Sequence, residues 1–184
     1  MITTLLIVSP LLFALLVLMG KRALRERLSI IFVVFLAILS IYAFVSYTGS
    51  LKFVLSHSFH ILFAVLDILV IVYFIWQGFI KKDSLVKLFG FLQLALFIFV
   101  LFLSPSLNSF DVLVDRLSTI MYLVINIVGG IIIVYALGYI KSEGFSTFRK
   151  NAFIAMLFFF LSVMNFIVST NNIEIFFLLF ELTT

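Results

Sequence analysis

Residues 116–140 read RLSTIMYLVINIVGGIIIVYALGYI, an apolar run whose charged side chain stands at its first position. A helix of about 20 such residues crosses the ~30 Å hydrocarbon core of a bilayer. A last run begins near Asn172 and holds about 13 residues, or ~20 Å of helix. The pattern predicts an all-α polytopic membrane protein, with six full transmembrane helices and the start of a seventh in a single domain over 1–184. The other full runs lie at 2–19, 28–47, 54–80, 85–104 and 151–169.

Composition agrees with a lipid environment, because hydrophobic residues make up 65% of the chain and charged residues 11%. An average soluble domain has about twice that share of charged residues. The short final run would end inside the membrane with unsatisfied carbonyl groups. We therefore expect the 184 residues to be the N-terminal part of a longer subunit.

Basic residues indicate the orientation, because lysine and arginine concentrate on cytoplasmic loops. Ten of the twelve basic residues lie on alternate links between the runs. These links are predicted to be cytoplasmic, which places the N-terminus outside. The net charge of +4 then reflects topology and gives no reason to expect nucleic acid binding. The ten residues are Lys21, Arg22, Arg25, Arg27, Lys81, Lys82, Lys87, Lys141, Arg149 and Lys150.

The chain has no cysteine, which excludes disulfides, iron–sulfur ligation and thiol chemistry within it. Two histidines without a supporting carboxylate cluster do not indicate a metal site. We therefore expect no cofactor, no metal and no catalytic residue in this chain. Any redox chemistry is expected on other polypeptides.

Glu181 is the first candidate functional residue, because a charge in the membrane interior costs several kcal/mol. It stands about nine residues into the last run, ~13 Å from its start. Such a carboxylate can switch its charge with a basic partner, or it can be protonated and hydrogen-bonded to a neighbouring helix. Residue type and depth favour the first interpretation. Glu174 is expected at the interface.

Asp67 lies near the middle of the third run. At 100° per residue, His57, His60 and Asp67 fall within about 80° of one another on a helix. This stripe can pass protons between the outer surface and the midplane. It can equally be a packing seam, with Asp67 protonated and bonded to Gln93 or Asn126. The sequence leaves both interpretations open.

Other polar or special residues in the runs have structural explanations. Asp115 at the start of a helix accepts backbone N–H bonds and favours the helix dipole. Pro10 can kink the first helix, which neighbouring helices can accommodate. Interhelical hydrogen bonds or close helix packing are expected at Asn126, Ser162, Asn165, Gly129 and Gly130.

Two stretches carry a family resemblance. They are FDVLVDRLSTIMYLVINIVGGIIIVYALGYI at 110–140 and FRKNAFIAMLFFFLSVMNFIVSTNNIEIFFLLFELTT at 148–184. The first has an acid–x–Leu–Ser helix start, and the second contains FFLLFEL, in which Phe180 stands where the family usually has tryptophan. The stretches resemble the antiporter-like, proton-translocating membrane subunits of respiratory complex I. That family is related to Mrp-type sodium/proton antiporters and to the membrane arm of energy-converting nickel–iron hydrogenases.

By this resemblance, Glu181 falls on the family's essential mid-membrane glutamate, which pairs with a buried lysine on a later helix beyond Thr184. Asp115 and Ser118 match family positions with a structural role at the outer end of an earlier helix. Residues 54–104 depart from the complex I pattern by adding two helices. DILVIVYFIWQGFIKKDSLVKLFGFLQLALF, at 67–97, looks more like the enlarged subunits of energy-converting hydrogenases.

The resemblance implies translocation of H⁺ or Na⁺ by a membrane-arm subunit of a redox-driven oxidoreductase complex. Iron–sulfur, nickel–iron or flavin groups would lie on partner chains. The implied partners are other membrane-arm subunits, a peripheral redox arm and lipid, and the implied location is a prokaryotic cytoplasmic membrane. The alternative is a non-pumping scaffold or assembly subunit whose acids are protonated packing contacts.

Overall fold

The structure is a computed structural model that describes residues 2–20, 22–82, 84–103, 110–142 and 144–183, without the side chains of 22–24, 57 and 100–103. Within these residues the chain forms seven helices and one two-stranded sheet. It divides into two compact units. The first is built from residues 1–51 and 114–169, and the second from 52–113 and 170–182.

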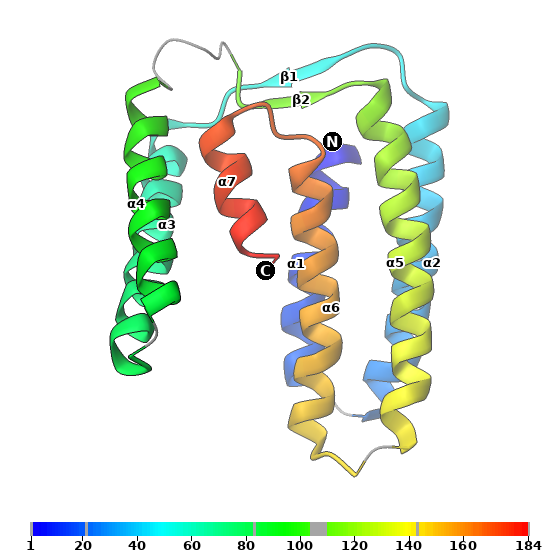
Figure 1. The fold of residues 1–184 in the computed structure, drawn as a ribbon. Helices are drawn as coiled ribbons and strands as arrows, with labels where there is room; N and C mark the ends of the chain where they lie inside the picture. Colours follow the sequence, from blue (N-terminus) through cyan, green and yellow to red (C-terminus); the bar gives the residue numbers. More distant parts are fainter. Residues whose placement is uncertain (1, 21, 83, 104–109, 143, 184) are drawn as a thin grey trace. The chain divides into compact units, whose positions relative to one another are not determined.

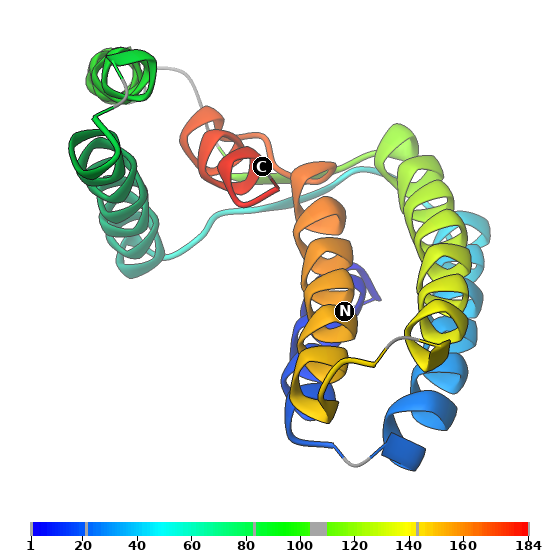
Figure 2. The ribbon, with the colours of Figure 1, turned by 60° about the horizontal axis from the view of Figure 1, so that its bottom comes forward.

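The first unit is a bundle of four helices. Helix α1 packs along α6, and α2 packs along α5, which also contacts α6 (Figures 1 and 2). The α1–α2 and α5–α6 links lie at the same end of the bundle (Figure 1), as the alternation of basic residues predicts. The helices are α1 (Ile2–Met19), α2 (Arg22–Val45), α5 (Arg116–Ser142) and α6 (Thr147–Ile167).

Helix α2 begins six residues before the predicted run at 28–47. Hydropathy marks the part of a helix that lies in lipid, whereas Ala, Leu, Arg and Glu at 22–27 favour helix in any solvent. The buried Arg25 in this segment donates to Asn151 Oδ1 at 2.7 Å. Glu26 forms an ion pair with Lys141 at 3.1 Å. These contacts hold the end of the bundle that carries both links.

Pro10 lies inside α1, where its ring removes the N–H that would bond the carbonyl of Leu6. Asn165 Nδ2 on α6 donates to that carbonyl at 3.1 Å, and the hydroxyl of Ser162 donates to the next one. Asn165 also exchanges two hydrogen bonds with Asn126 of α5, at 3.0 and 3.1 Å. The interhelical bonds predicted for these polar residues are confirmed, and the bond from Asn165 satisfies the Leu6 carbonyl that the proline leaves open.

Gly129 and Gly130 stand where α5 meets its neighbours. A Cβ on Gly130 would lie 2.5 Å from Val33 Cγ1 on α2, and one on Gly129 would overlap the Leu161 side chain on α6. Close helix packing at these glycines, predicted from the sequence, is confirmed.

The second unit contains three helices and most of the sheet. Helices α3 and α4 pack against each other, and α7 contacts both. The strands were not predicted, because at three residues each they leave no alternating pattern long enough to read. The elements are α3 (His57–Ile80), α4 (Ser84–Leu103), α7 (Ile173–Glu181), β1 (Leu51–Phe53) and β2 (Val112–Val114).

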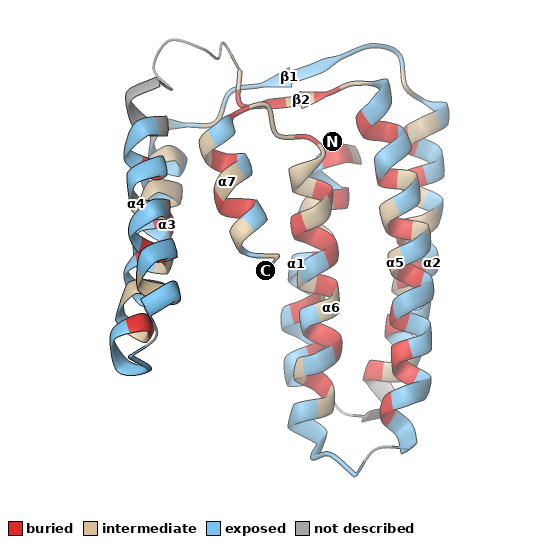
Figure 3. Ribbon diagram, in the orientation of Figure 1, coloured by how far each residue is buried: buried red, intermediate tan, exposed pale blue. Residues whose placement is uncertain are grey.

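Within the described part of the chain, five helices are long and apolar enough to cross a membrane. Many of their large apolar residues are exposed, and Figure 3 colours the exposed residues pale blue along these helices, where a soluble protein would carry polar groups. The chain is therefore an integral membrane protein. Six full helices with a seventh begun, the outside N-terminus, and an insertion at 54–104 stay predictions.

Candidate functional site

A buried carboxylate, Asp111, joins the beginnings of α3 and α7 in the second unit. Its Oδ2 accepts a hydrogen bond from Leu55 N at 2.8 Å and lies 3.2 Å from Nε2 of His60. Its Oδ1 accepts from Asn172 Nδ2 at 2.8 Å. The backbone N–H of Asp111 donates to the Phe53 carbonyl at 3.0 Å, and its backbone carbonyl accepts from Asn171 N at 2.7 Å. These residues form the Asp111 anchor: Phe53, Leu55, His60, Asp111, Asn171 and Asn172.

The anchor also organises the first turn of both helices. Asn172 is the N-cap of α7, with its side-chain oxygen accepting from Glu174 N at 2.9 Å while its amino group holds Asp111. Ser56 precedes α3 and makes no side-chain cap bond. The Asp111 carboxylate therefore fixes the start of α3 through Leu55 and His60, and the start of α7 through Asn172.

Asp67 and Glu181 lie at similar distances from the anchor. Helices α3 and α7 run away from it in the same direction (Figure 1). Asp67 follows His60 by seven residues, and Glu181 follows Asn172 by nine, which correspond to ~10.5 and ~13.5 Å of helix at 1.5 Å per residue.

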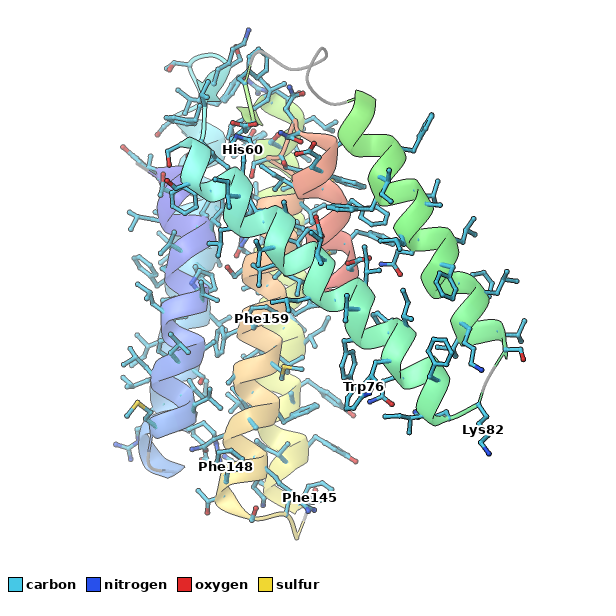
Figure 4. All side chains as sticks on the ribbon, turned by 90° about the vertical axis from the view of Figure 1, so that its left-hand side faces the viewer. His60, Trp76, Lys82, Phe145, Phe148 and Phe159 are labelled. Carbon is cyan, nitrogen blue, oxygen red and sulfur yellow. The ribbon has the colours of Figure 1, made fainter. Side chains whose placement is uncertain are left out.

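Asp67 is buried, with 1% of its surface exposed. It belongs to a stripe on α3 in which every third or fourth residue is covered, from His60 through Asp67 and Ile71 to Gly78. Figure 4 shows His60 at the anchor end of α3, and Trp76 and Lys82 toward the other end. Among the described residues, Asp67 Oδ1 has no hydrogen-bond partner. The suggested bond to Gln93 or Asn126 is therefore not made by this oxygen.

Of the two histidines in the predicted stripe, His60 is the one whose side chain the structure describes. His60 contacts Asp111 and shares the covered face of α3 with Asp67. His57 is the first residue of α3, and its side chain lies outside the described part of the chain. The structure thus brings His60, Asp67 and Glu181 together in one unit.

Asp115 has a different setting, at the start of α5 in the first unit. Its Oδ1 accepts from Ser118 N at 2.7 Å and from Ser118 Oγ at 2.9 Å. These hydrogen bonds hold the pKa of Asp115 below its usual value. The neighbouring Arg116 lies over the ring of Phe44, 5.3 Å from its centre. This is the geometry of a helix cap.

Sequence reasoning missed Asp111. An aspartate directly before Val112–Val114 and an Asn-Asn pair before a short helix each look like ordinary turn chemistry. What joins them is a tertiary contact between residues 61 positions apart. The pairing of one buried acid with an N-cap asparagine is the signal, and it becomes visible when the segments are brought together.

Residues 106–149 match the family model described as NADH-ubiquinone oxidoreductase (complex I), chain 5 N-terminus. This antiporter-like membrane subunit family is the one that residues 110–140 resemble, so the resemblance is confirmed there. The match includes Asp111, Asp115 and Ser118 and ends before Glu181. The comparisons found no match among curated proteins or solved structures.

Proposed function

We propose that this membrane protein translocates protons or sodium ions as a membrane-arm subunit of a redox-driven complex, with Glu181 as its mid-membrane acid. The observation that carries the proposal is the match of residues 106–149 to the complex I chain 5 N-terminal family. A subunit of this kind moves ions while electrons pass through partner chains. The partners are other membrane-arm subunits and a peripheral redox arm, and the location is a prokaryotic cytoplasmic membrane.

The setting of Glu181 supports its proposed role. It is the last residue of α7, a helix of nine residues whose start is tied to Asp111 through Asn172. The short helix holds the carboxyl ~13.5 Å from its capped start, and α7 packs against α3, the helix that carries Asp67. A carboxyl removed from bulk water responds strongly to nearby charge, because the low dielectric strengthens each interaction.

The mechanism needs a second group whose charge changes with that of Glu181. The family resemblance supplies a lysine on a later helix. When a desolvated lysine and glutamate approach, each stabilises the charged form of the other, and when they separate the proton can move on. Movement driven by the redox partners thus becomes directed proton transfer, with Glu181 as the fixed half of the pair.

Proteoliposomes test the proposal directly. The complex that contains this chain is reconstituted with Glu181→Gln or with Glu174→Gln, which removes an acid from the first turn of the same helix. The ratio of ions moved to electrons transferred is measured with a pH-sensitive dye and a sodium electrode. Glu181→Gln is expected to lower the ratio by the share of ions that this subunit carries, whereas Glu174→Gln keeps it.

The same experiment separates pump from scaffold and proton from sodium. A Glu181→Gln complex that keeps the normal ion-to-electron ratio contradicts the proposal and favours the non-pumping scaffold. The detector whose signal falls in the variant identifies the ion.

A further inference from the structure

We propose that one end of the α5–α6 pair binds an anionic phospholipid. Its phosphate lies at Arg149 and Lys150, and one acyl chain lies in an apolar groove farther along the same two helices. The site belongs to the first unit and is independent of the role proposed for Glu181. It adds a ligand class to this chain, a phosphate diester that carries acyl chains.

The headgroup pocket lies where α5 ends and α6 begins. Figure 4 shows Phe145 at this end of the bundle, in the link between the two helices. The pocket has a volume of about 190 Å³, less than the ~300–1,000 Å³ of sites that enclose a drug-sized ligand, so it holds a headgroup while the acyl chains lie outside it. Two cations and several aromatic or aliphatic side chains line it: Tyr139, Ile140, Phe145, Arg149, Lys150 and Phe153.

The charges of Arg149 and Lys150 are available to a ligand, because no ion pair in the described part of the chain includes either of them. Glu26, the acid of α2, is held by two other basic residues at 3.1 and 3.8 Å. The segment 139–153 carries three basic residues and one acid, Glu143, which lies outside the described residues. The excess of positive charge in this segment attracts an anion.

Both basic residues stand at the depth of the lipid phosphates. They are among the first residues of α6, a helix long enough to span the bilayer, on the side that the sequence predicts to be cytoplasmic. Basic pockets between transmembrane helices on that side bind anionic headgroups, and tyrosine is frequent at the same depth. The N–H groups at the start of a helix add partial positive charge. The chemistry of the pocket thus fits a phosphate at the membrane surface.

An apolar groove continues from the pocket on the same face of α5 and α6. Residues seven apart on a helix differ by only ~20° in direction, so Ile133 of the groove shares a face with Ile140 of the pocket. The same spacing relates Phe160 to Phe153 on α6. Along α5 the groove begins ~10.5 Å from Ile140, within the ~15 Å depth of one leaflet, so an acyl chain reaches it from the pocket. The lining is apolar throughout and includes Val128, Gly129, Ile133, Leu157, Phe160 and Leu161.

Photocrosslinking tests the site in the complex that contains this chain. The complex is reconstituted into phosphatidylcholine nanodiscs with a varied fraction of phosphatidylglycerol that carries a diazirine on one acyl chain, and mass spectrometry identifies the labelled peptides. Saturable labelling is expected at 128–133 and 157–161. A basic residue at the membrane surface contributes about 1 kcal/mol, or about a factor of five, so Arg149→Gln/Lys150→Gln is expected to raise the half-saturating fraction about 25-fold.

The matched control is Lys81→Gln/Lys82→Gln, which removes two adjacent lysines at the end of α3 and is expected to leave the half-saturating fraction unchanged. Phosphatidylcholine with the same diazirine carries no net charge and is expected to label these peptides less at equal fraction. If the double variant does not assemble, Arg149→Gln alone is expected to raise the half-saturating fraction about fivefold. The comparison of the two lipids needs no substitution.

The site is overturned by a half-saturating fraction that is unchanged in the double variant, or by equal labelling with the two lipids, because the groove then takes acyl chains without selecting a headgroup. Labelling that inorganic phosphate abolishes at constant ionic strength also overturns it, because the pocket then binds free phosphate. Absence of label in the wild type shows that another helix covers the groove, and this result overturns the site as well.

Discussion

The Asp111 anchor makes a strong prediction about local stability. Asp111→Ala removes the acceptor for Leu55 N and for Asn172 Nδ2, each at 2.8 Å, and the partner of His60 at 3.2 Å. Hydrogen bonds to a charged group are worth about 1.5–3 kcal/mol each, and loss of one partner from a buried charged network costs about 3–5 kcal/mol. We expect a local loss near the lower end, about 3 kcal/mol, because water reaches the exposed side of His60.

Hydrogen exchange measured by mass spectrometry on the intact complex detects this loss of local stability in the segments concerned. Each 1.4 kcal/mol corresponds to a factor of about ten in an equilibrium, so amide exchange at 53–60 and 170–176 should accelerate by about 100-fold. Asp111→Asn should give a smaller effect. Its amino group must face either Leu55 N or Asn172 Nδ2, both donors, so about one hydrogen bond is lost, worth about 1–2 kcal/mol.

The matched control is Asp115→Ala, which removes another acid at the start of a helix. Loss of an N-cap costs about 1 kcal/mol and should accelerate exchange in the first turn of α5 alone. Exchange at 53–60 and 170–176 that stays within about threefold of wild type in Asp111→Ala, a change under 1 kcal/mol, would refute the anchor.

Two further predictions concern the first unit. Asn165→Leu should destabilise the bundle by about 1–3 kcal/mol, because hydrogen bonds within membranes contribute about 0.6–1.7 kcal/mol each. The loss of stability should be smaller in a Pro10→Ala background, because alanine lets α1 satisfy the Leu6 carbonyl itself. Equal losses in both backgrounds, measured by thermal unfolding in detergent, would contradict the contact. The lowered pKa of Asp115 means that its cap stabilises the fold above the usual carboxyl range and stops doing so as pH falls through that lowered value. Asp115→Asn keeps a cap that does not titrate, so it should reduce the fall in stability at acid pH. If stability falls at acid pH as steeply in this variant as in the wild type, the cap is not the source of that fall.

The transmembrane pattern is predictable because hydropathy reports directly on the solvent of a helix. The run at 116–140 agrees with α5 to within two residues, and the third run ends with α3 at Ile80. The role of Asn165 was also accessible, since a polar residue in lipid needs an interhelical partner. The sequence did not predict that its partner is the carbonyl left open by Pro10, because this pairing depends on how α1 and α6 align.

The candidate site was predictable only in its separate parts. Glu181 and Asp67 stand out because acids are rare in apolar runs. The common starting point of their helices depends on Asp111, which lies outside every run and looks like a turn residue. Its contacts with His60 and Asn172 join residues 51 and 61 positions apart along the chain, and such contacts leave no local signature.

The central claim is that Glu181 changes its protonation state when the complex works. Infrared difference spectroscopy on the reconstituted complex, recorded between rest and steady turnover, measures this directly. The account predicts a carboxyl band that changes on turnover, disappears in Glu181→Gln and persists in Glu174→Gln. A turnover spectrum that is identical in wild type and Glu181→Gln would show that this carboxyl does not take part in ion translocation.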